Sequence, residues 1–210
     1  MNLLSDDKKE RLQEIIKLSW NILIEYIVSG KVKINKESSL QLYYSAILKQ
    51  IGETFCIKPD EIFSVELETH YKGKNIDIFC SLGSIKATIE MKCFKELSNS
   101  GGKSAAQDIK MYDVFVDVCR LSSYVDEKYV DLGIFLCYTD YKYFVDGNEM
   151  KGFAKTFSTR NGSQYRKGVI KPPWVGRWKN KSRDNDIVLT RNITFNWVSK
   201  NKHNFLFLPV

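Results

Sequence analysis

The stretch NIDIFCSLGSIKATIEMKCF, from Asn75 to Phe94, decides the fold of this 210-residue chain. It predicts two strands that are joined by a tight turn near Gly83. Side chains alternate across a strand, so Glu90 and Lys92 project from the same side of the second strand. If the two strands pair through this turn, Asp77 lies opposite or diagonal to Glu90. Two such carboxylates repel each other unless a cation lies between them, and Mg2+ is typically held by one or two protein carboxylates.

A solvated sheet face is the alternative interpretation of this pattern, because acidic residues and a Glu-x-Lys occur on many polar strand faces. The opposite face of the second strand is apolar, which places the polar groups together against an otherwise hydrophobic strand. Carboxylates and an ammonium grouped in this way are the functional groups that phosphodiester hydrolysis uses.

Asp77 followed by Glu90-Met91-Lys92 resembles the PD-(D/E)xK nuclease superfamily, which includes many restriction endonucleases. Ile76 stands where the superfamily usually has a proline. The resemblance implies that Asp77, Glu90 and the backbone carbonyl of Met91 hold Mg2+, with Mn2+ as a substitute. It also implies that Lys92 orients or activates the attacking water and stabilises charge on the phosphate.

The superfamily often brings an acidic residue from its first core helix toward the metal. Helical periodicity predicts that helix from Glu37 to Ile51, and we expect Glu37 to take this role. Alternatives remain on the same helix and on the strand predicted from Ile62 to His70. They are Gln41, Glu53, Glu66 and Glu68.

The remaining patterns predict a helix from Ser5 to Gly30, a helix from Ser104 to Leu121 and a fully covered strand from Val130 to Tyr138. The second of these helices is expected to face the sheet with Ile109, Tyr112, Val116 and Cys119. The resulting α-β-β-β-α-β order implies, by the resemblance, an α/β restriction-endonuclease-like core with a mixed central sheet flanked by helices. We expect a single domain over 1–210, with an N-terminal helix (1–35), a catalytic core (36–140) and a basic, β-rich extension (141–210).

The extension carries ten Lys and Arg residues and no acidic residue between Lys151 and Arg183, with aromatic residues among them. Cations neutralise phosphates and aromatic rings stack on bases, so we expect a nucleic-acid surface here; a solvated basic loop is the alternative. The candidate binding residues are Arg160, Arg166, Lys167, Lys171, Arg177 and Lys179, together with Lys103 and Gln107 near a helix N-terminus that favours phosphate.

Composition narrows the possible partners and chemistry. The net charge of +7 and the pI near 9.0 favour a polyanionic partner. Two histidines disfavour His-dependent nucleases and zinc hydrolases, and five cysteines without a C-x-x-C pair favour a reduced, cytoplasmic protein. No secretion signal or membrane span is expected.

Together these features predict a Mg2+-dependent endodeoxyribonuclease that hydrolyses duplex DNA, of a restriction type or a phage-defence type. Cleavage of both strands favours a homodimer. The alternatives are a non-catalytic nucleic-acid-binding module that keeps the fold, and a ribonuclease of the same fold.

Overall fold

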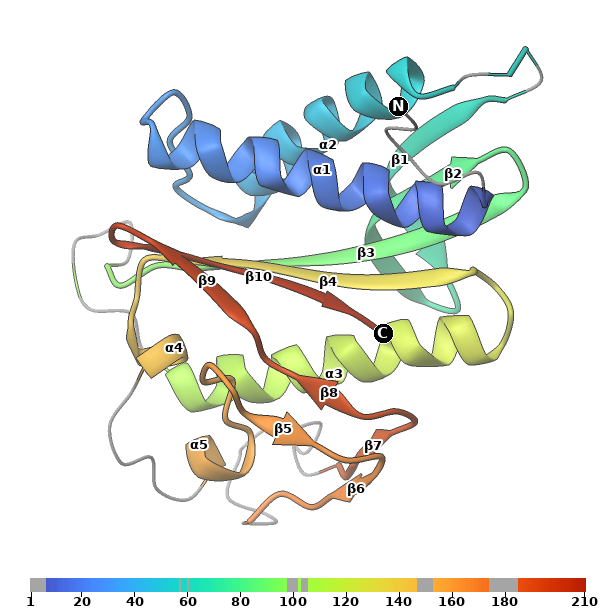
Figure 1. The fold of residues 1–210 in the computed structure, drawn as a ribbon. Helices are drawn as coiled ribbons and strands as arrows, with labels where there is room; N and C mark the ends of the chain where they lie inside the picture. The colour runs from blue at the N-terminus through green and yellow to red at the C-terminus, as the bar shows by residue number, and fades with distance from the viewer. Residues whose placement is uncertain are drawn as a thin grey trace.

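The computed structural model describes residues 7–56, 58–59, 61–97, 102, 106–146, 153–173 and 185–210. A six-stranded mixed sheet in the order β1-β2-β3-β4-β10-β9 forms the middle layer (Figure 1). Its strands are β1 (Phe63–Tyr71), β2 (Lys74–Leu82), β3 (Ile85–Phe94), β4 (Leu132–Thr139), β9 (Trp197–Lys200) and β10 (His203–Pro209). Helices α1 (Lys8–Val28) and α2 (Glu37–Thr54) cover one face, and α3 (Gln107–Asp126) covers the other. The predicted mixed α/β class, with a central sheet between helices, is confirmed.

The sheet is built from short hairpins and one crossover. Strands β1, β2 and β3 pair antiparallel through tight turns, where Gly73 and Gly83 take the positive φ angles of 76° and 59°. Strand β4 pairs parallel to β3, which requires a long connection, and α3 provides it. From α2 to β4 the chain therefore runs helix, three strands, helix, strand.

Two hydrophobic cores lie on the two faces of the sheet. Alternation in β3 sends Ile89 and Met91 into the core beneath α1 and α2. Trp20 of α1 belongs to the same core and packs edge-on against Tyr44 and Phe205. The opposite face of β3 is covered by α3, which leaves Glu90 only 1% exposed. Tyr26 and Tyr43 recur at helical spacing with the apolar residues of α1 and α2, which predicts that they are buried, but both are exposed.

The C-terminal extension both completes the sheet and adds a small layer. Its elements are α4 (Tyr143–Asp146), α5 (Phe153–Thr156), β5 (Gln164–Tyr165), β6 (Gly168–Ile170), β7 (Ile187–Leu189) and β8 (Ile193–Thr194), followed by β9 and β10. The pairs β5–β8 and β6–β7 lie on the side of α3 away from the sheet (Figure 1). Phe115 of α3 joins this layer through ring contacts with Phe157, Tyr165 and Phe195. Helix α3 is thus packed between the sheet and the extension. Within the described residues, no helix has both the length and the apolar character needed to cross a bilayer.

Candidate active site

The predicted acidic pair meets where β2 and β3 separate. Backbone pairing between the two strands extends as far as Ile78 opposite Ile89. One residue beyond this pair, the Asp77 side chain bridges the two strands, because its Oδ2 accepts a hydrogen bond from the amide of Met91 at 2.7 Å. Asp77 is therefore fixed beside the Glu90-Met91-Lys92 segment, on the neighbouring strand, as the hairpin register predicts.

Glu90 is a buried carboxylate with one oxygen satisfied. Its Oε2 lies 2.7 Å from Nη2 of Arg120, whereas its Oε1 is buried and has no hydrogen-bond partner among the described residues. Burial raises the pKa of Glu90 to about 8; the Arg120 guanidinium opposes this, and the neighbouring carboxylates of Asp77 and Asp117 add to it. An oxygen left without a donor in such a place is costly unless a further group binds it.

Lys92 lies at the centre of a ring of carboxylates. Its Nζ is 3.4 Å from Oε1 of Glu37, 3.2 Å from Oδ2 of Asp117 and 3.2 Å from the carbonyl oxygen of Met91. Burial lowers the pKa of Lys92, but Asp117, Glu37 and Asp77 together raise it above its ordinary value. Lys92 is accordingly an ammonium at neutral pH.

Helix α2 contributes two of the polar residues that the sequence singled out. Glu37, in its first turn, is the residue that reaches Lys92, and burial raises the pKa of its carboxyl group. Gln41, one turn later, donates from Nε2 to the carbonyl oxygen of Asp77 at 2.7 Å and to Oε1 of Glu68 at 3.0 Å. Glu53 does not join them, because it lies at the far end of α2, exposed and paired with Lys49.

Strand β1 brings one of its two glutamates toward the site. Glu68 has a φ of 53° and stands level with Asp77, between the paired positions Leu67–Ile78 and Thr69–Ile76. Its carboxylate is tied to Gln41 and to Asn75. Glu66 is exposed and has no described contact with the site.

Two site residues on α3 were missed by the sequence interpretation. Asp117 is buried, and its Oδ1 lies 2.8 Å from Nη2 of Arg120, so this guanidinium bridges Asp117 and Glu90. The sheet-facing stripe of α3 contains Val114, Val118 and Leu121. Asp117 falls within that stripe at helical spacing, and a charged residue inside an apolar stripe was the available signal.

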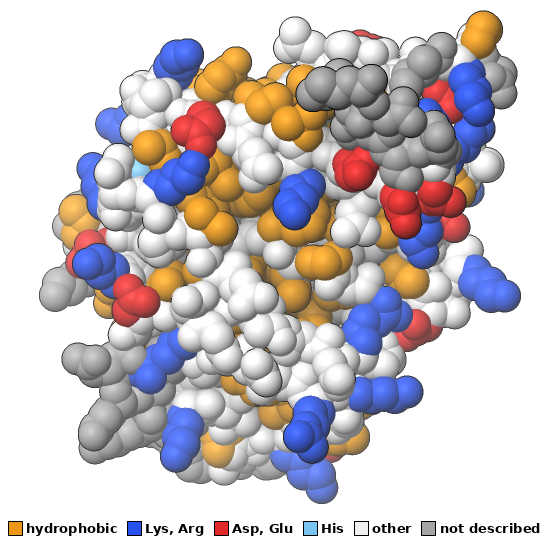
Figure 2. Space-filling view, viewed as in Figure 1, with side chains coloured by type: hydrophobic (Ala, Val, Ile, Leu, Met, Phe, Trp, Pro, Cys, Tyr) orange, Lys and Arg blue, Asp and Glu red, His pale blue; other side chains and the backbone are white. Residues whose placement is uncertain are grey.

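The described residues of the predicted nucleic-acid segment lie apart from this cluster. Arg166, Lys167 and Lys171 are exposed around β5 and β6, and Arg160 is half-buried. Figure 2 shows Lys and Arg side chains spread over the lower part of the molecule, where these strands lie. Gln107 is the first residue of α3, whereas Lys103, Arg177 and Lys179 lie outside the described residues. Among the described residues, no hydrogen bond or ion pair joins Arg160, Arg166, Lys167 or Lys171 to Asp77, Glu90 or Lys92.

The donor set fits a hard cation, although the side chains are not arranged as a closed metal cage. Within the described ranges, no group of three or more His, Cys, Asp and Glu side chains is positioned to hold a metal ion. Asp77 and Glu90 each face a protein donor, the Met91 amide and Arg120. The buried, unpartnered Oε1 of Glu90 is the position at which a cation would be accommodated, and carboxylate and carbonyl oxygens are the donors that Mg2+ and Mn2+ prefer.

No family model, no curated protein and no solved structure matches the chain. Two features of the residues themselves point to function. One is the sequence pattern of Asp77 followed by Glu90-x-Lys92. The other is the convergence of these three side chains with Glu37 from α2 and Asp117 from α3.

Proposed function

We propose that this protein is a metal-dependent nuclease of the PD-(D/E)xK superfamily, an endodeoxyribonuclease that hydrolyses phosphodiester bonds of duplex DNA. The observation that carries the proposal is the grouping of Asp77, Glu90 and Lys92 on adjacent strands, with Glu37 of the preceding helix in contact with Lys92. The order α2, β1, β2, β3, α3, β4, with β3 and β4 parallel, supports it as the α-β-β-β-α-β order of the superfamily core.

In this proposal the metal ligands are Asp77, Glu90 and the carbonyl oxygen of Met91. A bound Mg2+ or Mn2+ would supply Lewis-acid charge that activates water and stabilises the phosphate as negative charge develops. Asp77 is held ready by the Met91 amide, and Gln41 holds the backbone of Asp77 against α2. Perturbed carboxylate pKa values next to a specific charge partner are typical of functional sites.

Lys92 has an electrostatic role in this scheme. Because its neighbours raise its pKa, Lys92 holds its proton at neutral pH and does not act as a general base. It is positioned to donate hydrogen bonds and to offset charge on a phosphate that enters between the carboxylates. Glu37 and Asp117 fix the position of its ammonium group.

Metal binding through Asp77 is testable by thermal unfolding. We expect Mg2+ or Mn2+ to raise the Tm of the wild-type protein. At a metal concentration of about 100 times Kd, binding adds about 2.7 kcal/mol to the free energy of unfolding. Asp77→Asn should lose most of this stabilisation, because it removes the charge while its amide oxygen still accepts the Met91 N–H. Asp131→Asn is the matched control, since Asp131 also accepts a backbone amide, that of Lys86 at 2.8 Å, outside the site. An equal metal-induced shift in both variants would remove Asp77 from the site.

Substrate class is tested by incubating the protein with duplex DNA and with RNA of the same sequence in Mg2+. The proposal predicts cleavage of the DNA. Cleavage of RNA alone would identify a ribonuclease, and binding without cleavage of either would identify a non-catalytic module.

A further inference from the structure

A cationic cleft opens at one end of the sheet, beside the candidate active site. Two adjoining cavities of about 380 and 820 Å3 share four lining residues: Lys33, Lys95, Asp140 and Lys202. Their walls come from the α1–α2 connection, the ends of β3 and β4 and the β9–β10 turn, which meet at the left of Figure 1. These volumes are in the range of ordinary ligand sites.

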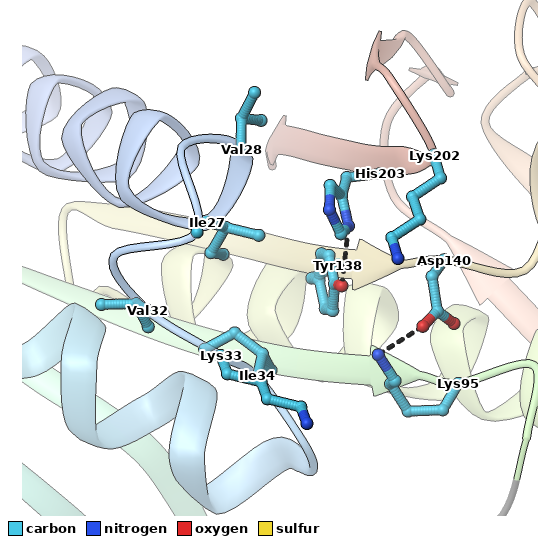
Figure 3. A pocket seen from close by; sticks show the side chains of 11 residues that line it. Ile27, Val28, Val32, Lys33, Ile34, Lys95, Tyr138, Asp140, Lys202 and His203 are labelled. Carbon is cyan, nitrogen blue, oxygen red and sulfur yellow. Dashed lines mark hydrogen bonds and ion pairs between the residues drawn. The ribbon is translucent and has the colours of Figure 1, made fainter.

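The positive charge of this cleft is largely uncompensated. Asp140 is already neutralised, because it forms an ion pair with Lys95 and accepts the amide of Glu96 at 2.9 Å (Figure 3). Three other lysines line the cleft and form no ion pair with any described residue: Lys33, Lys36 and Lys202. Glu96 is the one further acid in the lining. A cleft of this charge favours an anion.

The smaller cavity, of about 380 Å3, also has an apolar wall, which a simple anion does not need. Figure 3 shows Ile27, Val28, Val32 and Ile34 on one side of it, across from Tyr138 and His203. Val28, Val32 and His203 are half-buried and form the accessible part of this wall, whereas Ile27, Ile34 and Tyr138 are buried behind them. The Tyr138 hydroxyl and His203 Nδ1 are hydrogen-bonded at 2.9 Å, which fixes the His203 ring. An occupant with both a flat, weakly polar part and a negative charge matches these walls, and an unpaired nucleotide has both.

Two residues that line the cleft are close in the sequence to residues of the carboxylate site. Lys36 immediately precedes Glu37, whose carboxylate lies 3.4 Å from the Lys92 ammonium. Lys95 follows Lys92 by three residues and is the first residue after the end of β3. Because three extended residues span about 10 Å, the two regions lie within reach of one nucleic-acid strand.

We propose that this cleft binds one unpaired strand of the nucleic-acid substrate, with phosphates at Lys33, Lys36 and Lys202 and bases against the apolar wall. The proposal rests on the proposed nuclease function and extends it, because it assigns the path of one strand and requires the duplex substrate to be unpaired locally where that strand enters the cleft. Bases in a duplex are stacked and paired, so their faces are not free to contact such a wall, whereas a single strand exposes them.

The test is fluorescence anisotropy with a labelled single-stranded oligonucleotide and its blunt duplex, in EDTA, so that binding is read without cleavage. Lys36→Gln/Lys202→Gln removes two charges from the cleft. Lys17→Gln/Lys86→Gln removes two exposed charges from α1 and from the opposite end of β3. We expect the cleft variant to bind the single strand about tenfold more weakly at low salt, with the slope of log affinity against log salt reduced by about 1.4, or about 0.7 per lost contact. The control variant should change both much less.

Four outcomes would overturn this inference. The first is an equal loss of single-strand affinity in the cleft variant and the control variant, and the second is tighter binding of the duplex than of the single strand through the cleft lysines. The third is displacement of the labelled strand by a mononucleotide at matched phosphate concentration, and the fourth is displacement of the labelled strand by poly-glutamate to the same extent as by unlabelled strand. The third would identify a free-nucleotide site and the fourth an acidic-peptide site. Because the assay contains no metal, a protein that binds strands as expected but cleaves nothing in Mg2+ would refute the nuclease proposal and leave the cleft assignment standing.

Discussion

Lys92→Met is expected to slow Mg2+-dependent DNA cleavage by about 10²–10³-fold, the usual cost of removing one group that stabilises transition-state charge. Methionine keeps most of the side-chain volume, and the Lys92 side chain is 20% exposed, so the fold should persist. Binding of DNA in Ca2+ should also persist, because Asp77, Glu90 and the cleft lysines remain. Cleavage rates on a plasmid, with circular dichroism as the check on folding, measure the effect.

The matched control for this change is Lys86→Met on the same strand. Lys86 is exposed at the beginning of β3, outside the carboxylate cluster. Its loss should leave the cleavage rate within about twofold, because exposed surface substitutions have small effects. If both variants cleave at the wild-type rate, Lys92 has no part in the chemistry.

Arg120→Met is expected to lower the free energy of unfolding in EDTA at about pH 9.5, above the pKa of Glu90, by about 3 kcal/mol, as when one partner of a buried ion pair is removed. Arg120 is the cation that compensates both Glu90 and Asp117. Adding Glu90→Gln should recover most of the loss, because the amide is neutral. Arg191→Met, which breaks the more exposed pair with Asp126, should cost less than about 1 kcal/mol.

The effect of Arg120→Met should depend on pH in a defined direction. The pKa of Glu90 in the folded protein, about 8, lies above the ordinary value of 4.5, so the folded state keeps a proton that the unfolded state releases. Stability from this proton is present below about pH 4.5 and is lost as the pH rises through about 8. Removing Arg120 raises this pKa further, so the two folded proteins bind different numbers of protons only above about pH 8. The loss caused by the substitution should therefore be nearly constant from about pH 5 to pH 7 and grow as the pH rises above about 8. A loss that does not grow between about pH 7 and pH 9.5 would contradict the pairing of Arg120 with Glu90.

The positions of Asp77, Glu90 and Lys92 could be predicted because they depend only on local rules. A two-residue period and a turn at Gly83 set the register of one hairpin, and the structure has that register. Glu37 could be placed near the site only with the help of the superfamily resemblance, and the structure puts it against Lys92.

Asp117 and Arg120 were missed because the buried face of α3 was assigned one step away. The sequence interpretation put Val116 toward the sheet, but Val116 is 38% exposed and Val114 and Val118 are buried. One residue turns a helix by about 100°, so this error hid the acidic residue next to Val116. The alternative interpretation of a solvated sheet face does not hold at Glu90, because α3 and its charged side chains cover that position.

The cleft could not be predicted from local patterns at all. Lys33 and Lys202 are brought together by the return of the chain to the sheet as β10, which pairs with β4. The basic segment from Lys151 to Arg183 was predicted as the nucleic-acid surface instead, and its described residues lie across α3 from the sheet.

The central claim is that the Asp77–Glu90–Lys92 site hydrolyses DNA with a metal ion. Its most direct test is incubation of a supercoiled plasmid with wild-type protein in Mg2+, in EDTA, and with Asp77→Asn in Mg2+. We expect conversion to nicked, linear or fragmented DNA by the wild-type protein in Mg2+ alone. An intact plasmid in all three reactions, or equal cleavage by wild-type protein and Asp77→Asn, would contradict this account.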